Sequence, residues 1–97
     1  MPVYVMAGLN VDDAAAYEEY AVKGVASLGE HNVKVLAVSD APVALEGTNP
    51  YGRYVLLEFA DQAAADAWYR SSTYQAAIPI RQATARTGFL VAVPGLG

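Results

Sequence analysis

The stretch RYVLLEFADQAAADAWYRS, residues 53–71, contains the pattern that decides the fold. Its first part, residues 53–59, is dominated by Tyr, Val, Leu and Phe, which favour a β-strand. Asp61 follows at a position typical of a helix N-cap, and an alanine-rich segment then runs to Arg70. We therefore predict a strand over residues 53–59 and, after a short turn, a helix that ends near Arg70.

The same two kinds of element recur upstream and downstream of this stretch. We predict further strands over residues 2–9, 33–38 and 89–93. A helix is predicted over residues 13–28, with Asp12 as its N-cap. One apolar stripe at helical spacing supports this helix: Tyr17, Tyr20, Ala21, Gly24 and Leu28.

The segment after residue 70 has a less regular pattern. Ser72 begins a capping-box sequence, which predicts a short additional helix. Pro79 should interrupt it, because proline lacks a backbone N–H and clashes with the preceding turn. We predict one more helical turn over residues 80–86, which Gly88 should end before the last strand.

The predicted order is strand, helix, strand, strand, helix, strand. This is the ferredoxin-like α+β arrangement, a four-stranded antiparallel sheet with its helices on one face. Right-handed crossovers then place the strands in the order 4-1-3-2. A chain of 97 residues has room for a single domain, so we expect one domain over residues 1–97.

Both faces of the predicted sheet are apolar. In the first strand Val3 and Val5 alternate with Tyr4 and Met6, and residues 89–93 are apolar throughout. Two helices cover only one face of a sheet, so the other face is expected to be a partner site. The simplest partner is a second copy, which would make the protein a homodimer through the sheet face. A monomer that exposes an apolar face remains the alternative.

Lys34 and Glu58 are the charged residues inside the second and third strands. In a hairpin centred near Glu46 they would lie opposite one another. An opposite-charge pair on an edge strand stabilises the pairing and opposes mispairing. The alternative is that both line an internal cavity; we favour the edge pair.

Composition excludes several classes of protein. Six Lys and Arg residues against ten Asp and Glu give a net charge of −4, so we expect no nucleic-acid partner. No apolar run reaches the ~18 residues of a membrane span, and no signal peptide is recognisable, so we expect a cytoplasmic protein with no membrane partner. The chain has no Cys and one His, and no known cofactor or metal motif, so we predict neither cofactor nor metal.

No strong catalytic motif is present, so the sequence leaves open whether the protein is an enzyme. The candidate residues are instead aromatic and basic. Arg81 follows Tyr74 by seven residues, and a guanidinium beside phenols suits a small carboxylate or enolate. The alternatives are a salt bridge from Arg81 to Glu46 or Glu58, and core packing for Trp68, Tyr69 and Tyr74. His31, the only His, is more typical of an exposed loop than of a metal or haem ligand.

The chain resembles, almost from end to end, the family called domain of unknown function 1330 in the dimeric α+β-barrel superfamily. The motifs that support this are Pro2-Val-Tyr-Val-Met6, Tyr17-Glu-Glu-Tyr20, Leu45-Glu-Gly47, Leu57-Glu-Phe59, Trp68-Tyr-Arg-Ser71, Tyr74-Gln75 and Arg81-Gln-Ala83. The resemblance implies a ferredoxin-like protomer whose sheet pairs with that of a second protomer to form a barrel. It also implies a ligand-binding cleft framed by Glu46, Trp68, Tyr69, Ser71, Tyr74 and Arg81.

Two functional hypotheses follow. The first is a small-molecule protein that binds an organic, anionic ligand between sheet and helices. Members of the superfamily include cofactor-free monooxygenases, haem-degrading enzymes and isomerases, so oxygenase or isomerase chemistry belongs to this hypothesis as a fold-level analogy. In that chemistry Arg81 would stabilise negative charge and Glu46 or a Tyr would move a proton. The second hypothesis is a non-catalytic dimeric structural or interaction module.

Overall fold

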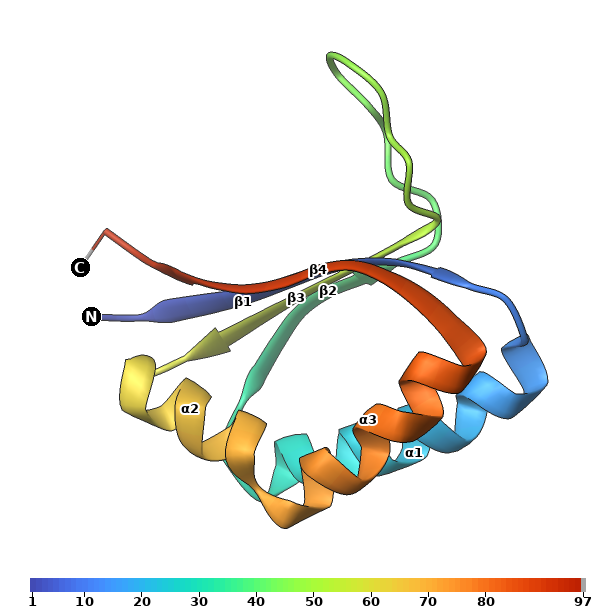
Figure 1. Cartoon of the computed structure of the whole chain (residues 1–97). Coiled ribbons are helices and arrows are strands. Elements are labelled where there is room, and N and C mark those ends of the chain that lie inside the picture. The colour runs from blue at the N-terminus through green and yellow to red at the C-terminus, as the bar shows by residue number, and fades with distance from the viewer. Residues whose placement is uncertain (97) are drawn as a thin grey trace.

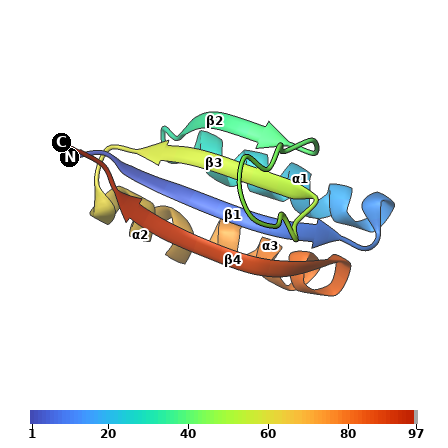
Figure 2. The same cartoon turned by 90° about the horizontal axis from the view of Figure 1, so that it is seen from above.

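The computed structural model describes residues 1–96, in which one antiparallel sheet carries its helices on a single face (Figure 1). The elements are β1 (Val3–Val11), α1 (Ala14–Gly29), β2 (Lys34–Ser39), β3 (Arg53–Phe59), α2 (Gln62–Arg70), α3 (Ser72–Thr84) and β4 (Ala85–Pro94). Figure 2 shows the four strands side by side, with both ends of the chain at the same end of the sheet. The predicted ferredoxin-like α+β fold is confirmed.

The strands stand in the order β2-β3-β1-β4, which is the predicted order read from the other edge. All three strand pairs are antiparallel. Lys34 lies opposite Glu58, so the hairpin register centred near Glu46 is confirmed. The two ion pairs found among residues 1–96 lie elsewhere, so Lys34 and Glu58 face one another without direct contact between their charges.

The last helix is longer than the sequence predicts. α3 is continuous over Ser72–Thr84, so the predicted interruption at Pro79 is wrong. Pro79 lies on the exposed side of the helix, where water can bond the carbonyl that proline leaves without an N–H partner. On the other side Tyr74, Ala77 and Arg81 are buried at helical spacing. Their packing holds the helix together across the proline.

The ends of α1 and β4 also differ from the prediction. The N-cap of α1 is Asp13 rather than Asp12, because the Asp13 carboxylate accepts the backbone N–H of Ala16 at 3.1 Å. Asp12 instead forms an ion pair with Arg86 of β4. β4 begins at Ala85, where the sequence predicts a helical turn, since Ala85 and Arg86 extend the ladder along the end of β1.

The position of α1 creates the space in which a ligand could lie. α1 packs against α3 far more than against the sheet. Two side-chain hydrogen bonds hold it there: Tyr20 to Tyr74 between hydroxyls at 2.8 Å, and Trp68 Nε1 donating to Ser27 Oγ at 3.1 Å. The inward side of β2 is therefore left without cover, and Val35 is exposed there although it faces the helical layer.

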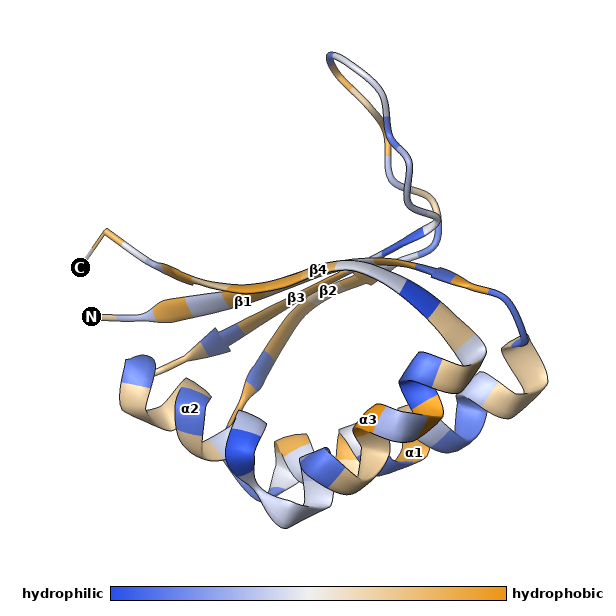
Figure 3. Ribbon diagram, in the orientation of Figure 1, coloured by the Kyte–Doolittle hydropathy of each residue, from blue (hydrophilic) through white to orange (hydrophobic). Residues whose placement is uncertain are grey.

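The sheet face away from the helices is also apolar, as Figure 3 shows along β1 and β4. Met6 pairs with Leu56 on one side and with Val91 on the other. Their strand neighbours Val5 and Leu57 are buried under the helices, so this row of three points to the opposite face. We call this face the open face. None of the helices within residues 1–96 is long and apolar enough to cross a membrane.

Ser27 provides a test of how α1 is held. It is fully buried, accepts the Trp68 indole N–H and donates to the Gly24 carbonyl at 2.6 Å. Ser27→Ala leaves the indole N–H without a partner in the core, so we expect the free energy of unfolding to fall by about 1–3 kcal/mol. Urea unfolding followed by the fluorescence of Trp68, the single tryptophan, measures this.

Ser39→Ala is the matched control. At the end of β2 the Ser39 hydroxyl accepts the nearby backbone N–H of Ala41 in an exposed hydrogen bond, so we expect a change of at most about 0.5 kcal/mol. If Ser27→Ala unfolded at the same urea concentration as the wild type, the Ser27–Trp68 hydrogen bond would not be what holds α1 against α2.

Candidate functional site

A cavity of about 220 Å³ lies between α1 and the sheet. We call it the inner cavity. Its walls are largely apolar: Val35 and Val38 of β2 face Gly24 and Val25 of α1, and Leu57 of β3 lies behind them. Because α1 leans towards α3, the cavity opens along the β2 edge of the sheet rather than being closed by the helix. Such a mainly apolar space with a few polar groups is typical of a site for a small organic molecule.

Three polar side chains of the inner cavity gather at its α3 end, while Arg53 lies where this cavity adjoins a second one. Arg81 Nη1 donates to the Tyr74 hydroxyl at 2.8 Å, and the Tyr74 hydroxyl is in turn 2.8 Å from that of Tyr20. The Arg81 guanidinium also lies over the Tyr20 ring, 5.9 Å from its centroid. Trp68 stacks at a tilt on Tyr74 with ring centroids 4.2 Å apart. Three elements, α1, α2 and α3, thus hold one guanidinium and its phenols in place.

Arg81 is a buried positive charge without a carboxylate partner in the described part of the chain. Its exposed fraction is 8%, and the ion pairs found among residues 1–96 join Arg53 to Asp40 and Arg86 to Asp12. The Nε atom of Arg81 is buried and has no hydrogen-bond partner among those residues. An arginine guanidinium remains charged at any physiological pH, and a buried charge without a counter-ion is costly. The site therefore has a buried positive charge that a bound anion would neutralise.

The phenols of Tyr74 and Tyr17 are weaker acids than an ordinary phenol. Burial, and then the neighbouring Tyr20, raise the pKa of the Tyr74 phenol far above its ordinary value, and the Arg81 charge offsets this only in part. Burial also raises the pKa of Tyr17. Both phenols are thus neutral at physiological pH and act as hydrogen-bonding groups. The residues that line the inner cavity include no carboxylate, histidine or lysine.

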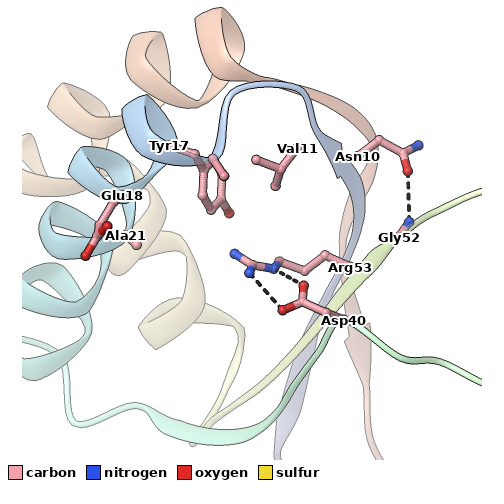
Figure 4. Close-up of a pocket in the computed structure, with 9 residues that line it drawn as sticks. Asn10, Val11, Tyr17, Glu18, Ala21, Asp40, Gly52 and Arg53 are labelled. Atoms are coloured by element: carbon pink, nitrogen blue, oxygen red, sulfur yellow. Dashed lines mark hydrogen bonds and ion pairs between the residues drawn. The ribbon is translucent and has the colours of Figure 1, made fainter.

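A second, more polar cavity of about 510 Å³ adjoins the first, and Figure 4 shows the residues around it. We call it the outer cavity. Tyr17, Ala21 and Arg53 line both cavities, so one space continues into the other. The Arg53 guanidinium lies 5.3 Å from the centroid of the Tyr17 ring and donates to both carboxylate oxygens of Asp40, at 2.6 and 3.0 Å. In contrast to Arg81, Arg53 already has its counter-ion.

The structure places three of the six residues predicted for the site in the inner cavity. Trp68, Tyr74 and Arg81 all line the inner cavity. Ser71 caps α3 by accepting the Tyr74 backbone N–H at 3.2 Å, so it positions the phenol from outside the cavity. Tyr69 is 41% exposed and lines a third cavity of about 280 Å³ between α2 and β4, which shares Val5, Trp68, Arg81 and Leu90 with the inner cavity.

Glu46 is not brought together with these residues within one protomer. It is exposed in the connection between β2 and β3, which rises from the sheet on the side away from the helices (Figure 1). The inner cavity lies on the helical side, so the sheet separates Glu46 from Arg81. The salt bridges considered from the sequence, from Arg81 to Glu46 or Glu58, are absent among residues 1–96.

Tyr20 and Arg53 belong to the site but are not among the residues predicted for it. Tyr20 is part of the predicted apolar stripe of α1, and nothing in the sequence indicates that its hydroxyl meets that of Tyr74 in α3. Arg53 begins β3 and meets Asp40 across the long connection. A basic residue at the start of a strand has no motif of its own, so only the hairpin register would have suggested this pair.

Comparison with protein families shows to which family the chain belongs. The model of the family described as "Domain of unknown function (DUF1330)" matches residues 2–96. The chain belongs to this family. The resemblance seen in the sequence motifs is thereby confirmed, and so is its implication of a ferredoxin-like protomer. No functionally curated protein matches the sequence significantly.

Solved structures share the fold at low sequence identity. A protein of unknown function from Rhodopseudomonas palustris is 19% identical with a TM-score of 0.78, covering 99% of this chain and 83% of its own. A dimeric ferredoxin-like protein of unknown function from Jannaschia sp. CCS1 is 19% identical with a TM-score of 0.71, covering 98% and 100%. SnoaB, a cofactor-independent oxygenase from Streptomyces nogalater, is 12% identical with a TM-score of 0.67, covering 99% and 94%. At these identities the likeness concerns the fold alone.

The Asp40–Arg53 pair predicts a pH dependence of stability. The hydrogen bond from Arg53 is the largest cause that lowers the pKa of Asp40 below its ordinary value. A carboxyl whose pKa is lower in the folded state stabilises the fold above its unfolded-state pKa and loses that contribution as the pH falls. We expect the wild type to be slightly more stable than Asp40→Asn at pH 7, and the difference to begin to fall near about pH 4 and to be lost as the pH drops through the lower pKa of Asp40 in the folded state.

Urea unfolding of the two proteins between pH 7 and pH 3 measures this difference. Arg53 is partly exposed and Asp40 is on the surface, so the effect is small and should shrink further in 0.5–1 M salt, roughly the range that screens exposed ion pairs. A difference that stayed constant down to pH 3 would contradict the role of this carboxylate.

Proposed function

We propose that this protein binds a small organic anion in the inner cavity, with Arg81 as the counter-charge. The observation that carries the proposal is the buried guanidinium of Arg81, which has no carboxylate partner within residues 1–96 and whose Nε atom has no hydrogen-bond partner there. A carboxylate or enolate accepts hydrogen bonds from a guanidinium in the plane of the group and removes the cost of an unpaired buried charge.

The apolar walls define the rest of the ligand. Apart from the Arg81–Tyr74–Tyr20 cluster, and from Arg53, Tyr17, Trp68 and Thr87, the cavity is lined by aliphatic side chains and glycine of the sheet and of α1. A ligand with one anionic end and an apolar body would place the anion at Arg81 and the body between β2 and α1. The opening along the β2 edge allows such a molecule to enter without unfolding of the helical layer.

Within the inner cavity, catalysis would be limited to substrates that arrive already ionised, since the nearest lining carboxylates, Glu18 and Asp40, belong to the outer cavity. The residues that line the inner cavity supply no carboxylate or histidine to remove a proton, and the Tyr74 phenol is held neutral. Arg81 and the phenols could still stabilise an enolate or phenolate by charge and hydrogen bonds. Cofactor-free oxygenase or isomerase chemistry on such an anion is the form of the enzymatic hypothesis that these residues support.

Arg81→Met tests the proposal with a matched pair of probes. 1-Naphthoate and 1-naphthol have the same apolar body, but only the carboxylate is charged at pH 7. We expect the wild type to bind 1-naphthoate at least roughly tenfold more tightly than 1-naphthol, and Arg81→Met to bind both equally weakly. Quenching of Trp68 fluorescence, confirmed by calorimetry, measures the two affinities.

The stability of the same variant separates binding from a structural role. Met fills a similar volume and removes an unpaired buried charge, so we expect the ligand-free variant to be as stable as the wild type or more stable. A fall of more than about 2 kcal/mol in the free energy of unfolding, with unchanged preference for 1-naphthoate, would make Arg81 structural. Failure of wild-type protein to bind either probe would favour the non-catalytic module.

We further propose that the protein is a homodimer through the open face. The open face exposes large apolar side chains, and Val91 on the edge strand β4 is 44% exposed. Contiguous apolar surface of this kind marks an interaction site. Proteins of the same fold from Jannaschia and from Thermobifida fusca are described as dimeric. Two such sheets facing one another would form the α+β barrel.

Val91→Asp tests the dimer. Val91 is already partly exposed in the protomer, so we expect the variant to fold but to place a charge in the interface and dissociate. Sedimentation velocity should give a dimer for the wild type and a monomer for Val91→Asp at the same concentration. Val22→Asp, on the outer side of α1, changes an equally apolar exposed residue away from the open face and should remain dimeric.

A further inference from the structure

The connection between β2 and β3 forms an arm, residues 40–52, whose tip is apolar. Val43 and Leu45 are 82% and 92% exposed, which makes them among the most exposed large apolar side chains within residues 1–96. Neither belongs to a helix or a strand. Figure 1 shows the arm rising from the open face, on the side opposite the helices. An apolar tip held out into solvent contributes nothing to the stability of an isolated protomer.

The arm is nevertheless fixed at its base. The Asp40–Arg53 ion pair joins its first residue to the residue that follows its last. Asn10 of β1 accepts the Gly52 backbone N–H at 2.8 Å and donates to the Pro50 carbonyl at 3.0 Å. Side chains of β1, of β3 and of the residue that follows β2 therefore set the direction in which the arm leaves the sheet.

The base of the arm also packs on the open face. The Tyr51 ring meets those of Tyr54 and Phe89 edge to face, with centroids 6.1 and 5.6 Å apart. A Cβ at Gly88 would collide with the Tyr51 ring, so the absence of a side chain at this position allows the base of the arm to pack against β4. The arm thus begins on the face proposed as the dimer interface and continues outward from it.

The length of the arm decides what it can reach. Each limb has about six residues and can extend up to about 20 Å, at ~3.3 Å per residue. Two sheets that pack face to face lie only about 10 Å apart. A second sheet packed on the open face would therefore lie beside the arm, and the arm is long enough to extend past it.

We propose that the arm of each protomer packs against a second copy of this chain, with Val43 and Leu45 as contacts between subunits. The inference rests on the homodimer proposed above and names a second contact region within it. A second copy fits because its own open face is apolar and its own arm would make the same contact in return, as two-fold symmetry requires. The arm is then a clasp that adds apolar area to the interface of the two sheets.

The clasp gives Glu46 a different place from the one the sequence suggests. Glu46 stands beside Leu45 at the tip and is separated from the inner cavity of its own protomer by the sheet. In the dimer joined by the two arms, the Glu46 carboxylate would lie beside the second copy. Any role of Glu46 at a ligand site is then a role in the other subunit.

Leu45→Asp tests the clasp. Because the contact occurs twice in a symmetric dimer, we expect the dimer dissociation constant, measured by sedimentation equilibrium, to rise by at least roughly tenfold. Leu96→Asp is the control, since Leu96 is fully exposed near the chain end, at the end of the sheet remote from the arm. Both variants leave the core unchanged, so their far-ultraviolet circular dichroism should match that of the wild type.

Photo-crosslinking locates the contact directly. The chain has no cysteine, so Leu45→Cys can be labelled at one position with benzophenone maleimide. We mix this labelled protein with ¹⁵N wild type, irradiate, and analyse crosslinked peptides by mass spectrometry. The clasp predicts a covalent dimer whose crosslinked peptides combine one ¹⁴N and one ¹⁵N chain; the same label at Leu96→Cys should give far less of it.

The outcomes separate the clasp from the dimer. If the wild type is dimeric and Val91→Asp dissociates it, but Leu45→Asp behaves like Leu96→Asp and crosslinks stay within one chain, the clasp is wrong and the dimer stands. If the wild type is monomeric at every concentration, the dimer proposal fails and the clasp fails with it. A tenfold rise in the dimer dissociation constant of Leu45→Asp, together with crosslinks between chains, supports both the dimer and the clasp.

Discussion

The attachment of α1 to the other helices, rather than to the sheet, is the interaction on which the candidate site depends. Tyr20 and Ser27 of α1 bond to Tyr74 and Trp68, so both hydrogen bonds draw α1 towards α2 and α3. A helix that lay flat on β2 and β3 would bury Val35 and its neighbours and leave no cavity. The same bonds that create the cavity also place two phenols at its end, so the space and its polar groups have one structural origin.

At that end of the cavity, the buried guanidinium of Arg81 lowers the stability of the ligand-free protein but suits the proposed binding of an anion. Taking an arginine charge out of water costs several kcal/mol, and neither a neutral phenol nor the face of the Tyr20 ring repays this as a carboxylate would. Arg53 shows the alternative within the same protein, because Asp40 pairs with it at the surface. A chain selected only for stability would provide Arg81 with such a partner. Its absence among the described residues is explained if the partner arrives with the ligand.

The sequence predicts the fold better than the site, for physical reasons. Strand alternation and the N-cap at Asp61 are local signals, and the symmetric placement of Lys34 and Glu58 about Glu46 predicts the hairpin register. Pro79 is misleading because its local penalty is smaller than the packing of the buried face of α3. The grouping of Tyr74 with Arg81 follows from helical spacing. The side of the sheet on which Glu46 lies depends on how the arm leaves the hairpin, which no local pattern specifies.

The sheet itself determines how the proposed site and the proposed interface relate. Successive residues of β1 point to opposite faces, so Val5 lines the inner cavity while Met6 lies on the open face. Ligand binding and assembly therefore use different side chains of the same strands and, to a first approximation, their free energies add. The arm breaks this separation, because it alone leaves the open face and extends beyond the sheet. Coupling between the two subunits' sites would have to pass through it or through the backbone of the shared strands.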